Sequence, residues 1–274
     1  MKEYIIKKVL NNNVVIATSK NSDFVLVGKA IGFNAKKGSK ISNDRIESMF
    51  IKQSLKKTNF DEVIENIDGK VIGICEEIIS MCEKEFNVKF SEAIHVSLPD
   101  HINFAFHRIE KGIKIENPFL YEISALYPKE YRLAKKALDM INSRFEVNLP
   151  EDEIGFICMH INAAIKQRGV SDTLAYTKKI GNIMELILKL LKKKLDKDSL
   201  AYVRTVTHIS FVLDRVINKK TIRNDLLDNI KEELYNEYDL AIKVAMKIED
   251  LFSIKVPEDE IGYLALHLKR LEDL

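Results

Sequence analysis

Eleven residues occur twice in this chain, and the repeat limits what the chain can fold into. The stretch "PEDEIGFICMH" covers residues 150 to 160, and "PEDEIGYLALH" covers residues 257 to 267. Outside it, His101 and Arg108 also have the same residue type 107 positions later. A solenoid would need several copies of a shorter unit. The single long period therefore predicts one duplicated domain.

Length and hydrophobic periodicity predict a multi-domain protein. The 274 residues, 46% of them hydrophobic, suffice for more than one core. Residues 3–31 hold three short runs rich in β-branched and aromatic residues, separated by the turn formers "NNN" and "KNS". From about residue 60, apolar residues recur at helical spacing. We therefore expect a small antiparallel all-β N-terminal domain followed by two homologous all-α helical-bundle domains. The expected domains cover residues 1–55, 60–169 and 170–274, with a linker at 53–59.

Several protein classes are disfavoured by composition. No apolar run approaches the roughly 18 residues that span a bilayer, and the start "MKEYIIKKVLNNN" lacks the apolar core of a signal peptide. We expect a cytoplasmic protein without membrane insertion. The three cysteines form no C-x-x-C pair, so they predict small buried side chains rather than a disulfide framework or zinc site.

Histidines mark the candidate chemistry of the helical part. A lone histidine beside a core face is more often a buried structural residue, but matched histidines in two copies indicate a shared task. No ligand spacing such as H-E-x-x-H accompanies them, and no Ser/His/Asp or Cys/His set recurs, so neither a metal, a cofactor nor enzymatic catalysis is expected. Imidazole can accept a phosphoryl group from another protein. The predicted phosphoryl acceptors are His101, His160, His208 and His267, whereas His95 and His107 have no counterparts.

The N-terminal segment is a candidate nucleic-acid interface. Residues 1 to 53 carry ten Lys/Arg against four Asp/Glu, which attracts phosphate. The asparagines offer donors and acceptors to base edges, the phenylalanine can stack on an unpaired base, and the glycines allow close backbone approach. Alternatively, "NNN" is only a hairpin turn, the phenylalanine is core and the lysines are a solvated edge. The candidate RNA-binding residues are Lys8, Asn11, Asn12, Asn13, Gly28, Lys29, Gly32 and Phe33.

The amino-acid sequence resembles a known family over essentially its whole length. "KKVLNNNVVIA" and "VLVGKAIGFNAKKG", then "LPDHINFAFHR", "NPFLYEISALYPKEY" and "LPEDEIGFICMH", are similar to BglG/SacY-type transcriptional antiterminators. The resemblance implies a dimeric co-antiterminator domain that binds an RNA hairpin, the ribonucleic antiterminator. It also implies two regulation domains phosphorylated on the four matched histidines by phosphotransferase proteins, HPr and a sugar-specific enzyme II. The wording is nearest to the glucose-operon branch, which implies control of a glucose permease gene.

Two departures from the family pattern bear on these expectations. Ala30 stands where a second glycine is common, at the expected close approach to RNA. Asp100 precedes His101, whereas Thr207 precedes the matched histidine of the second copy. An aspartate orients an imidazole better than a threonine does, so we expect the two modules to be unequal acceptors.

Two further points remain open at the level of sequence. Arg108 and Arg215 each lie seven residues after a candidate histidine, and we expect each to pair with a carboxylate at a helix start rather than to face a phosphoryl group. The alternative function is a DNA-binding transcriptional activator with the same regulation domains. That function would need a helix-turn-helix, whereas residues 1 to 53 predict strands.

Overall fold

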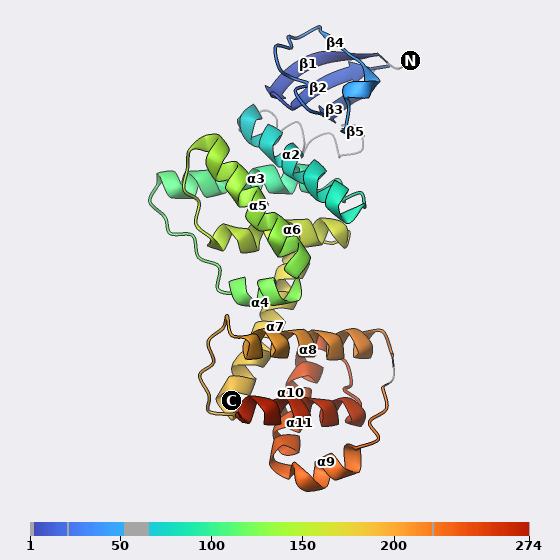
Figure 1. The fold of residues 1–274 in the computed structure, drawn as a ribbon, viewed down its shortest axis with the longest axis vertical. Coiled ribbons are helices and arrows are strands. Elements are labelled where there is room, and N and C mark those ends of the chain that lie inside the picture. The colour runs from blue at the N-terminus through green and yellow to red at the C-terminus, as the bar shows by residue number, and fades with distance from the viewer. Residues whose placement is uncertain (1–2, 21, 52–65, 221, 274) are drawn as a thin grey trace. The chain divides into compact units, whose positions relative to one another are not determined.

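The chain folds into a small β-sheet followed by helices, as the sequence predicts (Figure 1). The computed structural model describes residues 3–20, 22–51, 66–220 and 222–273. The expected linker at 53–59 lies outside these ranges. Among the described helices, none is long and apolar enough to cross a membrane.

The N-terminal sheet is antiparallel and has the strand order β4-β1-β2-β3-β5. Burial alternates along the first strand: Tyr4 and Ile6 are buried, and Ile5 and Lys7 are exposed. That alternation is the period-two pattern of a strand with one face on a core. The three longest strands fall on the three predicted runs. The strands are β1 (Tyr4–Asn11), β2 (Val14–Ser19), β3 (Ser22–Val27), β4 (Lys40–Ile41) and β5 (Ser48–Ile51), with a 3-10 turn, η1, at Asn43–Arg45.

The helices confirm the duplication. The helices α3, α4, α5 and α6 begin 106 or 107 positions before α8, α9, α10 and α11, respectively, and each set begins with one further helix, α2 or α7. The first set is α2 (Gly69–Phe86), α3 (Ile94–Glu110), α4 (Leu120–Leu126), α5 (Pro128–Phe145) and α6 (Asp152–Ile165). The second is α7 (Val170–Leu190), α8 (Leu200–Ile217), α9 (Leu227–Glu233), α10 (Tyr235–Phe252) and α11 (Glu258–Glu272).

The contacts divide the chain into two compact units that do not coincide with the two copies. One unit is Met1–Pro118 with Lys129–Thr173, and the other is Phe119–Pro128 with Leu174–Leu274. The second unit therefore includes α4, a helix of the first copy. In this unit α4 packs on α8, and the Tyr202 hydroxyl donates to Oε1 of the buried Glu122.

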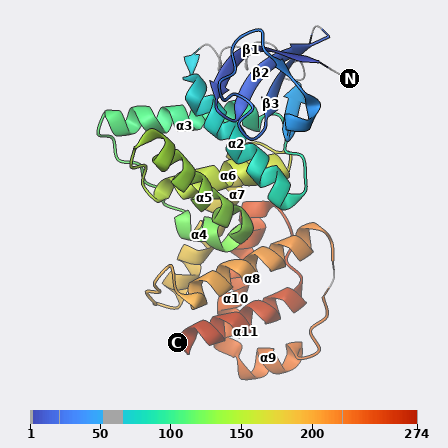
Figure 2. The same ribbon diagram turned by 45° about the horizontal axis from the view of Figure 1, so that its top comes forward.

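In the first unit, helix α2 lies against the sheet and contacts β1, β2 and β3 (Figure 2). A Cβ atom on Gly69 would lie 3.3 Å from Cδ2 of Leu10. One on Gly73 would lie 2.4 Å from Nδ2 of the Asn11 side chain. Glycine at these positions brings the helix backbone close to the end of β1. On its other side α2 packs on α3, and α3 packs on α6.

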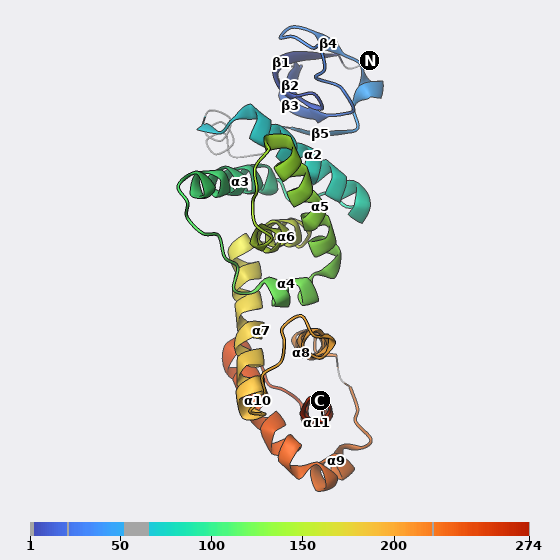
Figure 3. The ribbon, with the colours of Figure 1, turned by 60° about the vertical axis from the view of Figure 1, so that its left-hand side comes forward.

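The core of the second unit is built from buried side chains of α7, α8, α10 and α11. Figure 3 shows the ribbons of these helices. Ile183, Val206, Val244 and Leu264 are representative, and each is at most 3% exposed. Helix α11 contacts α8, α9 and α10. This packing fixes α11 against α8 and determines where their polar side chains meet.

Gly28 is needed by the protein's own backbone. A Cβ atom there would lie 2.0 Å from the carbonyl oxygen of Arg45, a backbone atom that no side-chain rotation can remove. The glycine lets the end of β3 pass next to the turn that follows β4. Gly28 is buried because the backbone of Arg45 and Glu47 lies against it.

We predict that Gly28→Ala destabilises the sheet by about 2 kcal/mol, because overpacking against backbone forces a shift of the chain. The measurement is amide hydrogen exchange of β3 in the full chain, which should accelerate by more than tenfold. Lys29→Ala is the matched control, since Lys29 is exposed. Equal protection in the two variants would show that the turn can move at little cost.

Candidate functional site

The first pair of matched histidines comes together between α3 and α6. The rings of His101 on α3 and His160 on α6 lie with centroids 5.1 Å apart, although the residues are far apart in sequence. A cavity of about 500 Å³ opens beside them and is lined also by Asp100, Phe104 and Arg168. The pair thus borders a space that a phosphoryl group could enter.

A buried carboxylate holds the more accessible of these rings. Oε2 of Glu153 lies 2.7 Å from Nε2 of His101, and the glutamate side chain is 0% exposed. The second oxygen of Glu153 has no hydrogen-bond partner among the described residues. His101 thus owes its orientation to the start of α6 and not to the adjacent Asp100, which the sequence favoured.

His160 is neutral over the physiological pH range. Burial, with a smaller contribution from His101, lowers its pKa from 6.5 to about 3. Its Nδ1 lies 3.2 Å from the hydroxyl oxygen of Ser97. A neutral ring with a lone pair is the form that can act as a nucleophile.

The second matched pair also meets, between α8 and α11. The ring centroids of His208 and His267 are 3.6 Å apart. Burial lowers the pKa of both rings, that of His267 to about 4, and the positive charge of Arg270 acts in the same direction. Neither ring has a carboxylate partner in the described part of the chain.

The arginine prediction is confirmed in one copy and wrong in the other. Arg215 donates from Nε and Nη2 to the two oxygens of Glu260, both at 2.6 Å, at the start of α11. Arg108 instead donates to the backbone oxygen of Lys114 at 2.9 Å. The carboxylate that matches Glu260 is that of Glu153, and its partner is the ring of His101 instead of an arginine.

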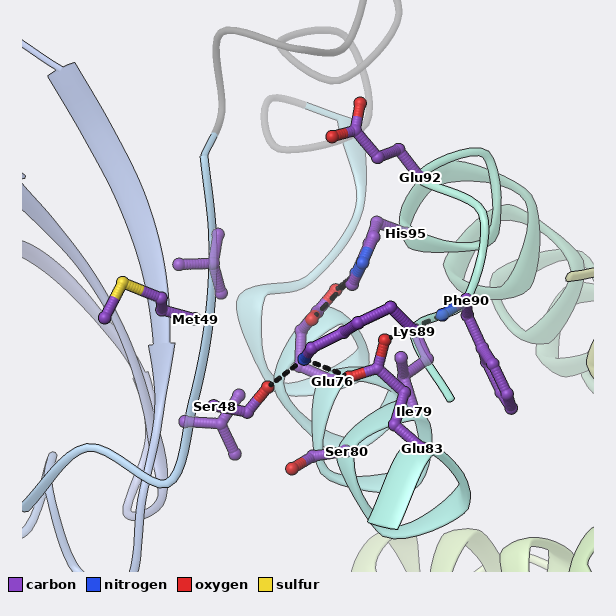
Figure 4. A pocket seen from close by; sticks show the side chains of 12 residues that line it. Ser48, Met49, Glu76, Ile79, Ser80, Glu83, Lys89, Phe90, Glu92 and His95 are labelled. Carbon is purple, nitrogen blue, oxygen red and sulfur yellow. Dashed lines mark hydrogen bonds and ion pairs between the residues drawn. The ribbon is translucent and has the colours of Figure 1, made fainter. Parts of the chain in front are cut away.

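The two unmatched histidines lie elsewhere. His95 places Nδ1 2.8 and 2.9 Å from the carboxylate oxygens of Glu76, beside a pocket that is also lined by Ser48 of the sheet, Glu83 of α2 and Lys89 of the segment after α2 (Figure 4). His107 is exposed and lies near Glu110. Each of these two rings therefore lies next to a glutamate.

Except for Lys8 on β1, the candidate RNA-binding residues of the sheet lie at the end of β1, in the turn after it and in the loop after β3. The backbone N–H of Gly32 donates to the oxygen of Asn12 at 2.9 Å, and that of Gly28 donates to the oxygen of Asn13 at 3.0 Å. The side-chain oxygen of Asn13 accepts from the N–H of Ala30 at 2.9 Å. These bonds join the turn after β1 to the loop after β3.

Ala30 adopts a left-handed conformation, with φ of 52°. Glycine adopts this conformation without strain, so its frequent presence at this position in the family has a conformational reason. Alanine meets the same geometry at a cost of about 1 kcal/mol.

Within the first unit, two of the three asparagines contact the helical part. Asn11 and Asn13 donate to the two oxygens of Glu77 on α2, at 2.8 and 3.0 Å. Two side-chain amides that are candidates for contact with base edges are therefore bonded to this carboxylate. By contrast Asn12, Lys8 and Lys29 are exposed, and Phe33 is 58% exposed. The alternative in which Phe33 is a core residue is therefore wrong.

The chain matches two family models in the order of its parts. The CAT RNA binding domain model matches residues 4–59, and the PRD domain model matches residues 76–164 and 181–271. The transcription antiterminator LicT of Bacillus subtilis (strain 168) is 33% identical over 271 residues, covering 97% of this chain and 98% of LicT. The chain belongs to this antiterminator family.

Two further similarities place it within the family. Protein GlcT of Staphylococcus aureus (strain JH9) is 32% identical over 303 residues and covers 100% of this chain, which in turn covers 98% of GlcT. The crystal structure of GlcT CAT-PRDI is 42% identical with a TM-score of 0.50, covering 59% of this chain and 98% of that one. These matches confirm the resemblance seen in the sequence, including its nearness to the glucose-operon branch. The antiterminator is a regulator and not an enzyme.

The site residues predicted from the sequence do not include the glutamates that lie at the paired histidines or at their matched arginine. Glu153 and Glu260 stand in acidic runs that are typical of a helix start, yet they are 0% and 1% exposed. A signal was available: Glu153 precedes His160 by seven residues, a spacing that places both on one helical face. Arg168, which lines the cavity in the first module, was also missed. Within the described residues, no group of three or more His, Cys, Asp or Glu side chains is arranged to hold a metal.

We predict that His160 makes the first unit less stable in mild acid. Its pKa is lowered from 6.5 to about 3 on folding, so the unfolded chain binds the extra proton between these values. Stability is full above pH 6.5 and falls as the pH drops toward 3, by about 2 kcal/mol between pH 7 and pH 5. Urea-unfolding midpoints followed by circular dichroism should show this loss.

His160→Gln should remove that part of the pH dependence, since glutamine does not titrate. His107→Gln is the control, because His107 is exposed and should leave the dependence intact. A wild-type midpoint that stays constant from pH 7 to pH 5 would contradict the prediction.

Proposed function

We propose that this antiterminator binds, through a dimer of its N-terminal sheet, an RNA hairpin that overlaps a terminator. The helical modules regulate this binding by accepting phosphoryl groups on His101, His160, His208 and His267. The observation that carries the proposal is the meeting of both matched pairs, with ring centroids 5.1 and 3.6 Å apart. Histidines held in pairs in two copies suit one repeated reaction.

Phosphorylation would act on these pairs through charge. Each phosphoryl group adds roughly two negative charges, and the first pair already faces the buried Glu153. Bringing such charges into a partly buried site shifts any equilibrium between two arrangements of the module. The proposed donors are HPr and a sugar-specific enzyme II, acting in the cytoplasm where the transcripts are made.

The regulated genes are proposed to be those of glucose uptake. This assignment rests on the words "KKVLNNNV" and "GKAIGF", which resemble the glucose-operon branch. The similarity to protein GlcT over 100% of the chain supports it.

The alternative of a DNA-binding activator receives no support from the fold. Such a protein would need a helix-turn-helix in its N-terminal part. The described residues between 3 and 51 form five strands and one 3-10 turn of three residues.

We predict that a fragment of residues 1–55 binds the cognate hairpin as a dimer, with affinity that falls steeply as salt rises. Phe33→Ala and Asn12→Ala should weaken cognate binding about tenfold, since one stacked base contributes about 1–3 kcal/mol. Lys40→Ala is the control: Lys40 is exposed, pairs with Glu3 and lies on the edge strand β4. Filter binding at several salt concentrations measures all three, and binding only by residues 60–274 would contradict the proposal.

We also predict that a reconstituted phosphotransferase cascade labels the four matched histidines and not His107. His107 is exposed, so absence of label there would reflect recognition rather than access. Peptide mapping must stay at neutral or alkaline pH, because the nitrogen–phosphorus bond is acid-labile. Label that persists at full level after His101→Ala, His160→Ala, His208→Ala and His267→Ala are combined would refute the site assignment.

A further inference from the structure

Glu153 and Glu260 occupy matched positions in the two modules but have different partners. They lie 107 positions apart, in the first turns of α6 and α11, and their side chains are 0% and 1% exposed. A buried carboxylate is costly unless a proton donor or a positive charge faces it. Each glutamate must therefore take a partner from the helix packed against it.

In the first module the partner is the histidine. Oε2 of Glu153 lies 2.7 Å from Nε2 of His101, while Arg108, which matches Arg215, donates to a backbone oxygen. A carboxylate can only accept, so Nε2 of His101 carries the proton. The other ring nitrogen, Nδ1, makes no hydrogen bond to another described residue and keeps its lone pair.

In the second module the arginine has taken that place. Both oxygens of Glu260 accept from Arg215 at 2.6 Å, which satisfies the carboxylate. His208 is left against His267, with ring centroids 3.6 Å apart. No carboxylate of the described residues fixes which of its nitrogens bears the proton.

We propose that Glu153 is a positioning residue that selects Nδ1 of His101 as the phosphoryl acceptor. In the second module Glu260 is paired with Arg215 instead of with a histidine, so His208 lacks the same assistance. The proposal rests on the proposed function of the matched histidines. It replaces Asp100 and Thr207, which the sequence suggested, as the source of the difference between the modules. The first module is thereby the better acceptor.

The chemistry balances without a further reactant. A bond forms between Nδ1 of His101 and the phosphorus of a phosphohistidine on a donor protein, and the donor's nitrogen–phosphorus bond breaks with its electron pair staying on the donor. The Nε2 proton remains on the ring. The positive charge that develops on the imidazole faces the carboxylate of Glu153, which stabilises it as a buried carboxylate does beside a catalytic histidine.

The test is Glu153→Gln in the full chain, because glutamine keeps the shape and an accepting oxygen but removes the charge. The phosphoryl donor is potassium phosphoramidate, a small molecule that needs no protein recognition. We expect the rate of His101 phosphorylation to fall about ten- to a hundredfold, as for other residues that orient an imidazole through its second nitrogen. Glu151→Gln is the matched control and should leave the His101 rate within about twofold, because Glu151 stands at the same helix start but is exposed to solvent.

A second measurement does not depend on any variant folding. Imidazole nitrogen resonances of the unmodified wild-type protein should show His101 with its proton on Nε2, and the phosphorylated protein should carry phosphorus on Nδ1. A purely structural role for Glu153 would not determine either signal. Phosphorus on Nε2, or equal His101 rates in wild type and a folded Glu153→Gln variant, would overturn the proposal.

The outcomes separate this inference from the proposed function. If the phosphotransferase proteins label wild type and Glu153→Gln equally fast, the inference fails while the function stands. If those proteins label neither, yet phosphoramidate labels wild-type Nδ1 faster, the function fails and the positioning role of Glu153 stands.

Discussion

A carboxylate without access to water lies at the start of the last helix of each module, and the arrangement of each histidine pair depends on how that charge is compensated. Glu153 and Glu260 are fixed in place by helices that start from the same six letters, "PEDEIG". The helix packed against each offers both a histidine and an arginine. Which of the two approaches the carboxylate decides whether the site holds an oriented imidazole or a closed ion pair. Duplication thus supplied two identical constraints, and a change of partner made them chemically different.

Much of the fold could be predicted from local patterns. The strands are visible as alternating β-branched runs, and the offset of 107 locates the second set of helices once the first is known. The same offset pairs His101 with His208 and His160 with His267. The offset alone does not show that His101 lies against His160. If it does, however, the repeat places His208 against His267 in the same way.

The missing parts are those that depend on burial and on distant contacts. Acidic residues at a helix start have a sufficient explanation in the helix dipole, and the seven-residue spacing only places Glu153 on the same helical face as His160. That Glu153 is enclosed while Glu151 is exposed depends on the packing of α6 against α3. The bonds from Asn11 and Asn13 to Glu77 join residues more than 60 positions apart. For the same reason Asp100, a neighbour in sequence, was preferred over Glu153, a neighbour only in space.

The membership of α4 in the second unit has a consequence for how this protein is divided in experiments. A piece cut where the second copy begins, at residue 170, retains α4 but discards α8 and with it Tyr202, the hydroxyl donor to Glu122. Glu122 is 1% exposed in the whole chain, and Ala125 is also buried. The cut therefore exposes a carboxylate and the apolar face around Ala125. Such a fragment exposes an apolar surface on α4 that can self-associate. Its self-association would then be a result of the truncation and not of regulation by phosphorylation.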